Sequence, residues 1–228
     1  ISNSHSLIGG IMGAGIIGLG FEQLVFGGLT KVFAGIIIAP IGGVIFGMAL
    51  VGIIITVFAK RRPAVVNRTF GRLQIISSAW FALTHGANDG QKTMGIIVLI
   101  LFSADLISEI HMPLWVIFAA ASAMGLGTFF GGYKVIKTLG LRITRLKPYQ
   151  GFAAETGGGI MLAVFAILGI PASTTHAITG TIMGAGAARR IRAVRWKVSR
   201  QIIFSWVITI PGAAGLAIAF TYIIHLFV

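Results

Sequence analysis

The amino-acid sequence predicts an all-α integral membrane protein, and three observations support this fold class. Hydrophobic residues make up 56% of the 228 residues and charged residues only 10%, a composition too apolar for a soluble domain. Several apolar tracts exceed the roughly 20 residues that cross a ~30 Å hydrocarbon core as a helix. A glycine-rich motif also occurs twice in the chain. Together these features predict helices that cross the membrane several times.

Basic residues predict how these helices are oriented. The net charge is +13, and most Lys and Arg residues gather in three segments, at 60–72, 134–147 and 189–200. Because cytoplasmic loops are enriched in Lys and Arg, we expect all three segments on the cytoplasmic side. The segments around Glu22 and around Asp105 and Glu109 lack basic residues and are expected outside. This distribution favours a membrane protein over a nucleic-acid-binding protein.

The membrane spans follow from these anchors. Spans at 35–59 and 113–133 run inward, and spans at 73–103 and 201–226 run outward. Residues 151–188 begin and end beside cytoplasmic charge, so this stretch must enter the membrane and return. Because proline disfavours helix at the preceding residue and lacks a backbone donor, Pro171 predicts the turn of a re-entrant hairpin at 171–175.

The turn of this hairpin carries hydroxyl groups within the sequence PASTTH. Irregular backbone at membrane depth occurs only where protein or a water-filled cavity satisfies its polar groups. Ser173, Thr174 and Thr175, with the free N–H groups of the helix that follows, would form an anion receptor. The alternative is that these side chains only cap a helix.

An internal repeat strengthens the anion-site interpretation. Residues 2–15, SNSHSLIGGIMGAG, match residues 173–186, STTHAITGTIMGAG, at a constant offset of 171, and the same offset relates Pro40 to Pro211. A neutral or acidic segment follows the first copy and a basic segment the second, so the copies should exit on opposite faces. Inverted repeats with broken helices are typical of secondary transporters, so we expect a transporter and no enzyme activity. The alternative is two similar helices that are rich in glycine for close packing.

A second polar motif, HGANDGQK at 85–92, lies in the span at 73–103. As a continuous helix this span would be about 45 Å long, which exceeds the core, so we expect a break near Gly86. An acidic residue this deep, Asp89, predicts an ion or proton path. Lys92 either neutralises Asp89 as a structural partner or contacts the substrate. Glu155, in the first half of the hairpin, either takes part in ion coupling or reaches the cytoplasmic interface.

The motifs GANDGQK, PASTTHAITG and SNSHSLIGG together resemble the PiT family of inorganic phosphate transporters, in particular its bacterial low-affinity members. The resemblance covers nearly the whole chain. It implies that 1–59 is the second half of a first repeat, 60–72 a cytoplasmic basic loop and 73–228 a second repeat. Because the chain begins inside a motif, we expect a first GAND-bearing helix upstream, without which this chain should not transport by itself.

The resemblance implies a fold and a set of site residues. The fold is an inverted-repeat secondary transporter with broken helices and a re-entrant helical hairpin, in which phosphate binds between the two hairpin tips and the two breaks in the GAND-bearing helices. The implied substrate-binding residues are Ser2, Asn3, Ser4, Asn88, Asp89, Ser173, Thr174 and Thr175. The implied coupling-ion residues are Asn88, Asp89, Lys92 and Glu155. Supporting residues are His5, His85, Gly86 and His176.

Lys92 departs from the family pattern. Where the sodium-coupled pattern reads N-D-x-x-N, this chain has Lys92 in place of the second Asn. An ammonium group cannot coordinate sodium but can occupy the place of a cation. We therefore favour proton coupling, or symport of a metal-phosphate complex that carries magnesium, with Asp89 or Glu155 as the proton carrier. The alternative is a sodium-coupled phosphate or sulfate symporter of the same fold.

Other classes of function fit the sequence less well. An intramembrane hydrolase would need a carboxylate to orient a Ser–His pair, and no motif supplies one. The five histidines are scattered, so neither a fixed metal site nor a cofactor is expected. We expect a multi-pass protein of the bacterial inner membrane whose partners are inorganic phosphate and membrane lipid, with a second copy of the chain as a candidate partner and no nucleic acid.

Overall fold

The computed structural model describes residues 2–227, apart from the side chains of residues 134–136. Lys134, the first residue of the basic segment 134–147, is therefore outside the described side chains. The elements of the described chain are all helical. The main helices are α1 (Asn3–Leu19), α2 (Phe26–Val57), α3 (Pro63–Ser103), α4 (Leu114–Lys137), α5 (Pro148–Ile167), α6 (Thr174–Ala187) and α7 (Trp196–His225). Three short helical turns link them: η1 (Phe21–Gln23), η2 (Thr138–Ile143) and η3 (Ile191–Ala193).

Four helical segments are long and apolar enough to cross a membrane. They are Phe26–Val57, Leu114–Ile143, Pro148–Ile167 and Trp196–His225. Three of them contain most of the predicted spans at 35–59, 113–133 and 201–226, which confirms those spans as helices. The fourth, α5, is the first leg of the predicted hairpin, and the shorter α6 is its second leg.

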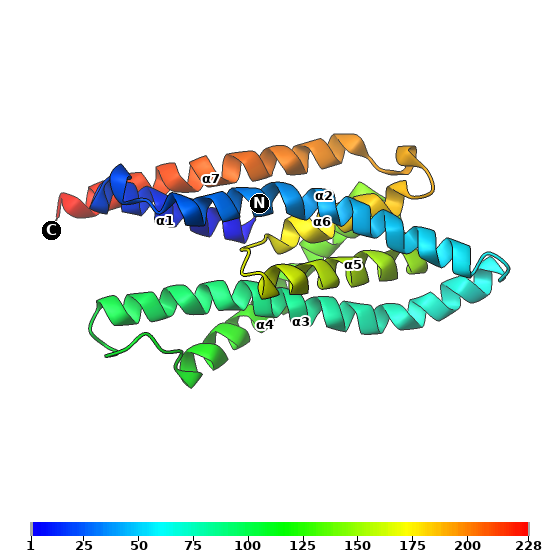
Figure 1. Cartoon of the computed structure of the whole chain (residues 1–228), viewed down its shortest axis with the longest axis horizontal. Coiled ribbons are helices and arrows are strands. Elements are labelled where there is room, and N and C mark those ends of the chain that lie inside the picture. The colour runs from blue at the N-terminus through cyan, green and yellow to red at the C-terminus, as the bar shows by residue number, and fades with distance from the viewer. Residues whose placement is uncertain (1, 228) are drawn as a thin grey trace.

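The basic and acidic segments lie at opposite ends of the molecule. Figure 1 shows the α2–α3 turn and the α6–α7 connection at one end, and η1 and the α3–α4 connection at the other. The remaining basic segment joins the first end, because the Arg195 N–H donates to the carbonyl of Ile143 over 2.8 Å. Gly71 of α3 also lies against Pro148 at the start of α5. The predicted separation of basic from acidic connections is therefore confirmed.

Each copy of the repeated motif packs against a helix of the other repeat. In Figure 1, α1 and α6 start near the middle of the molecule and run in opposite directions. α1 packs along α7 from the second repeat, whereas α6 packs along α2 from the first. Gly13 lies against the backbone of Ala214, and Gly184 lies against the backbone of Val44. The glycines thus do allow close packing, and the opposed directions are those expected of an inverted repeat.

The predicted break in the GAND-bearing span is wrong. Helix α3 runs without interruption from Pro63 to Ser103 through the HGANDG motif. Glycine permits an unwound backbone but does not impose one, and Gly86 keeps helical geometry with open space around it. The helix is in fact longer than the predicted span, since its first turns add residues of the basic segment at the end of the molecule.

The predicted cytoplasmic loop at 60–72 is also shorter than expected. Helix α3 begins at Pro63, the first helical position, where the fixed φ of proline and its missing N–H are both favourable. The prediction placed the boundary where the apolar residues begin, but a helix can start several residues earlier among charged residues that face water.

The hairpin packs into the core around the middle of the molecule. One buried cluster surrounds its turn and joins α2 to both legs; its members are Ala39, Met161, Leu162, Phe165, Ala172 and Ala177. A second buried cluster lies closer to the basic end and includes Val51, Phe70, Ile143, Tyr149 and Met183. The turn of the hairpin is therefore held between packed helices. It begins at Leu168, three residues before the predicted range 171–175, because Gly169 with its positive φ ends the first leg.

Candidate functional site

The N-terminal ends of α1 and α6 meet tip to tip. Ser2 caps α1 by accepting a hydrogen bond from the backbone N–H of His5, and Ser173 caps α6 by accepting one from His176, each over 3.4 Å. The two cap hydroxyl oxygens lie 2.8 Å apart and are hydrogen-bonded to each other. Both serines are buried. The repeated S-x-x-H pattern thus forms two equivalent caps that are in direct contact.

Each tip also presents backbone donors. In the first turn of a helix the N–H groups have no partner within the helix. The N–H groups of Asn3 and Ser4 in α1, and of Thr174 and Thr175 in α6, have no acceptor among the described residues. Two helix N-termini therefore direct partial positive charge and free donors at one region, which is an arrangement that favours an anion.

Lys92 bridges the two tips from α3. Its ammonium nitrogen donates to the hydroxyl of Ser4 over 2.9 Å, to Oδ1 of Asp89 over 3.0 Å and to the backbone carbonyl of Ala172 over 2.8 Å. These three bonds use all three donors of an ammonium group. The nitrogen is thus surrounded by hydroxyl, carboxylate and carbonyl oxygens, which are the ligands that hard cations prefer.

Asp89 links α3 to the tip of α6. Its second oxygen, Oδ2, accepts a hydrogen bond from the Thr174 hydroxyl over 3.0 Å and lies 3.3 Å from Nε2 of His85. The Asp89 side chain is only 15% exposed and that of Lys92 only 18%, so the pair is largely shielded from water. His85 therefore faces this carboxylate, four residues away on the same helix, rather than a backbone carbonyl. The HGANDGQK motif supplies both charges of the site.

The two histidines of the repeat pack together behind the caps. The rings of His5 and His176 are edge to face with centroids 4.3 Å apart, and His176 stacks on Trp206 of α7 at 3.7 Å. Nδ1 of His176 lies 3.3 Å from the carbonyl oxygen of Ile36 in α2. Both histidines are fully buried. Their contacts connect the tips to α2 and α7, which is consistent with the expectation that these histidines support the tips.

Several predicted residues lie at the edge of this cluster. Asn88 points to the hairpin leg, where its Nδ2 donates to the carbonyl of Leu162 over 3.3 Å. Asn3 is exposed and Thr175 is half-buried. Gly86 provides no contact and no break. The structure therefore brings together Ser2, Ser4, His85, Asp89, Lys92, Ser173 and Thr174, and it leaves the roles of Asn3, Asn88 and Thr175 as predictions.

Glu155 forms a separate polar cluster with α3. Its carboxylate accepts hydrogen bonds from the hydroxyls of Ser77 over 2.6 Å and Ser78 over 2.9 Å, and from the Gln74 amide over 3.3 Å. Ser77 precedes Asp89 by twelve residues, which corresponds to about 18 Å along a helix. Glu155 therefore does not contact the tips, although both clusters lie along the same helix.

Several groups in these two clusters were not predicted from the sequence. Gln74, Ser77 and Ser78 are spaced at i, i+3 and i+4 within an apolar span, and this pattern could have indicated a polar helix face. The carbonyl of Ala172 had no signal beyond its position after Pro171 in an irregular turn. Among the described residues no group of three or more His, Cys, Asp or Glu residues is arranged to hold a metal ion.

Comparisons with known proteins show the family to which this chain belongs. The model of the phosphate transporter family matches residues 58–217. A protein of Rhizobium meliloti (strain 1021) is 48% identical over 93% of this chain and 64% of its own length, and one of Bacillus subtilis (strain 168) is 38% identical over 99% of this chain and 68% of its own length. Both are named "Probable low-affinity inorganic phosphate transporter". The chain therefore spans roughly two thirds of the length of these relatives.

A solved structure shares the fold. It is titled "The sodium-dependent phosphate transporter", is 21% identical and superposes with a TM-score of 0.84 over 100% of this chain and 74% of that chain. At this identity the likeness establishes the arrangement of helices alone. The family model, however, covers more than half of the chain, and the Bacillus subtilis relative is matched over more than two thirds of its length. Both clusters thus lie in a chain that belongs to the phosphate transporter family, whose members are transporters and not enzymes.

Proposed function

We propose that this chain forms the core of a secondary transporter that moves inorganic phosphate across a bacterial inner membrane. The observation that carries the proposal is the meeting of two helix N-termini, with Ser2 and Ser173 in contact and Lys92 between the tips. Free backbone donors and hydroxyl groups are partners that a phosphate ion takes, and the ammonium group of Lys92 adds positive charge beside them. The family membership and the names of the relatives support the same substrate.

Asp89 also favours phosphate over sulfate as the substrate. At neutral pH both forms of inorganic phosphate, the monohydrogen and the dihydrogen ion, carry a proton and can donate a hydrogen bond, which sulfate cannot do. The carboxylate of Asp89 has lone pairs beyond those used by Thr174 and Lys92 and can accept such a bond. A sulfate ion at the same place would bring acceptor oxygens to a carboxylate without any donor between them.

Lys92 takes the place of a coupling cation. Its ammonium nitrogen is bound by a hydroxyl, a carboxylate and a main-chain carbonyl, and the carbonyl of Ala172 comes from the irregular hairpin turn. In secondary transporters, unwound backbone carbonyls of this kind coordinate sodium ions or interact with protons. With a tethered cation in this place, transport needs a proton, or a metal ion such as magnesium carried with the phosphate, and no sodium ion.

Glu155 is the better candidate for the proton carrier. Asp89 is held by the ammonium group of Lys92, so a proton on Asp89 would leave that charge uncompensated. Glu155 is held only by two hydroxyls and one amide, none of which is charged. An added proton on Glu155 therefore leaves no unpaired charge. Intramembrane carboxylates of this kind are typical members of proton paths.

The membrane orientation, the absence of a resident cofactor, the partners and the transport movement are proposed as the sequence predicted them. The protein is a multi-pass membrane protein in contact with lipid, and its basic connections face the cytoplasm. It has no resident cofactor, because the coupling ion moves with the substrate. A second copy of the chain is a candidate partner. The coupling mechanism is a rocking or elevator-like movement of the hairpin tips relative to the surrounding helices.

Uptake of labelled phosphate into proteoliposomes that contain the full-length transporter tests this function. Proton, sodium and magnesium gradients are varied one at a time, and sulfate is added as competitor. We expect saturable uptake that follows the proton gradient, or requires magnesium, and is unchanged by sodium. Uptake driven by sodium alone would contradict the role of Lys92, and stronger transport of sulfate than of phosphate would contradict the substrate.

A further inference from the structure

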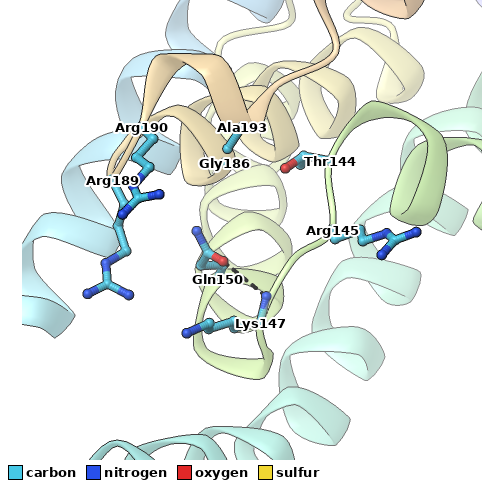
Figure 2. Close-up of a pocket in the computed structure, with 8 residues that line it drawn as sticks. All are labelled: Thr144, Arg145, Lys147, Gln150, Gly186, Arg189, Arg190 and Ala193. Carbon is cyan, nitrogen blue, oxygen red and sulfur yellow. Dashed lines mark hydrogen bonds between the residues drawn. The ribbon is translucent and has the colours of Figure 1, made fainter.

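A polar pocket lies at the basic end of the molecule, away from the helix tips. It has a volume of about 500 Å³ and lies where the start of α5 and the end of α6 meet the segment that follows η2. Its lining includes Thr144, Arg145, Lys147, Gln150, Arg189 and Arg190. Figure 2 shows Arg189 and Arg190 on one side of Gln150 and Arg145 on the other. The volume lies within the range of small-molecule binding sites.

The floor of this pocket is fixed by hydrogen bonds. The Gln150 amide donates to the carbonyl of Ala185 over 2.8 Å, and its oxygen accepts from the backbone N–H of Lys147 over 3.0 Å. Thr144 is buried beside Gly186, where any larger residue would press on the threonine side chain. The floor therefore connects the two legs of the hairpin at the end opposite to its turn.

The rim carries positive charge that no carboxylate of the described chain neutralises. Arg145, Lys147, Arg189 and Arg190 are exposed, and none of them forms an ion pair among the described residues. The chain has five acidic residues in all, and none lines the pocket. Four like charges around one opening repel one another, and an anion in the opening would relieve this repulsion.

We propose that this pocket binds a phosphate group from the cytoplasmic side. Arginine pairs with phosphate through two parallel hydrogen bonds, and basic pockets between membrane helices on this side hold lipid head groups. In Figure 2 the guanidinium groups of Arg145 and Arg189 extend outward, so binding requires them to turn toward the anion. The phosphate group belongs either to an anionic lipid or to free inorganic phosphate, since both present the same oxygens.

Binding in this pocket would act on the hairpin that carries Ser173 and Thr174. The pocket is lined by Gln150 in the first leg and by Gly186 near the end of the second leg. An anion held there draws the rims of both legs together and resists their separation. The pocket therefore provides a means for a cytoplasmic phosphate group to influence the movement of the tips.

Calorimetric titration of the full-length transporter in detergent tests this site. The probes are dihexanoyl phosphatidylglycerol, dihexanoyl phosphatidylcholine as the lipid without net charge, and inorganic phosphate. The pocket variant combines Arg189→Gln with Arg190→Gln. The matched control combines Arg61→Gln with Arg62→Gln, two neighbouring exposed arginines at the same end but outside the pocket.

We expect the pocket variant to bind one probe with an affinity about tenfold or more lower, and the control to change that affinity by about twofold at most. Loss of phosphatidylglycerol binding alone identifies a lipid site, whereas loss of one of two phosphate-binding events identifies free phosphate. If the pocket variant folds poorly, Arg145→Gln with Lys147→Gln alters the same pocket and should give the same loss. Equal effects of pocket and control variants on every probe would overturn the proposal.

This result is independent of the transport function. Phosphate binding between the tips involves none of the pocket residues, so a loss of uptake in tip variants would not contradict anion binding in the pocket. In the same way, a pocket that binds no probe leaves the proposed transport of phosphate in place.

Discussion

Asp89 and Glu155 are both carboxylates held between helices, but their partners differ in charge. Asp89 is hydrogen-bonded to the ammonium group of Lys92 and to Thr174 and lies beside His85. Glu155 has three neutral donors, the hydroxyls of Ser77 and Ser78 and the amide of Gln74. The first cluster joins the two tips, and the second joins the first leg of the hairpin to α3.

The difference in the charge of the partners suits the two carboxylates to two tasks, holding the tips together and exchanging a proton, which one carboxylate could not perform together. A carboxylate that is permanently paired with an ammonium group holds structure and compensates charge, but a proton on it would break the pair. A carboxylate among neutral donors can gain or lose a proton without leaving a charged partner behind. The comparison therefore supports the proposal that Asp89 holds the tips together and that Glu155 exchanges protons.

The largest effect is expected for Asp89→Asn in the full-length transporter. The change leaves the Lys92 ammonium without its charged partner in a shielded site, so phosphate uptake should fall by about 100-fold. The measurement is the initial uptake rate per amount of protein, with the unfolding temperature as a check on folding. Asp105→Asn, in the exposed α3–α4 connection, is the control and should transport normally. Normal uptake by Asp89→Asn would show that this carboxylate is not needed for phosphate transport.

Lys92→Asn should change the ion that drives uptake. The variant leaves the oxygens of Ser4, Asp89 and Ala172 free and adds an amide oxygen, so a sodium ion can occupy the vacated place. We expect uptake without sodium to fall by about tenfold and sodium to restore it. Lys31→Asn, at an exposed position, should show no response to sodium. A variant that stays slow at every sodium concentration would show that Lys92 does not replace a cation.

Glu155→Gln should affect the response to the proton gradient and little else. The amide keeps the size of the side chain but cannot carry a proton. Gradient-driven uptake should fall by about fivefold, while exchange of phosphate across vesicles at equal pH should continue. The control is Glu109→Gln, an exposed glutamate at the opposite end. If the variant still accumulates phosphate with the pH gradient, the proton is carried elsewhere.

The smallest effect is expected for Ser78→Ala. This change removes one of the three donors to Glu155 and leaves the other two in place, so we expect gradient-driven uptake to change by only about threefold. Ser78→Thr keeps the hydroxyl and should transport at the original rate. The readout is gradient-driven uptake at several pH values, because a shifted pH dependence distinguishes an effect on Glu155 from a general loss of stability. An unchanged pH profile would separate Ser78 from the proton path.

Much of the fold could be predicted from the sequence because it depends on local patterns. Apolar tracts between basic segments predicted the helices and their directions, and Pro171 predicted the turn of the hairpin. The offset of 171 predicted that the two tips are equivalent, and their caps at Ser2 and Ser173 are in contact. The break near Gly86 was wrong because a glycine permits unwinding only where other contacts favour it.

The sequence by itself therefore determined the helical class, the separation of basic from acidic ends and the two polar motifs, since composition and spacing act within a few turns of one helix. Only the tertiary structure decided that Lys92 meets Ser4 and Ala172, that Glu155 lies apart from the tips, and that each tip helix packs on a helix of the other repeat. These contacts join residues some 80 or more positions apart, and their pairing depends on how the helices pack, which no local pattern specifies.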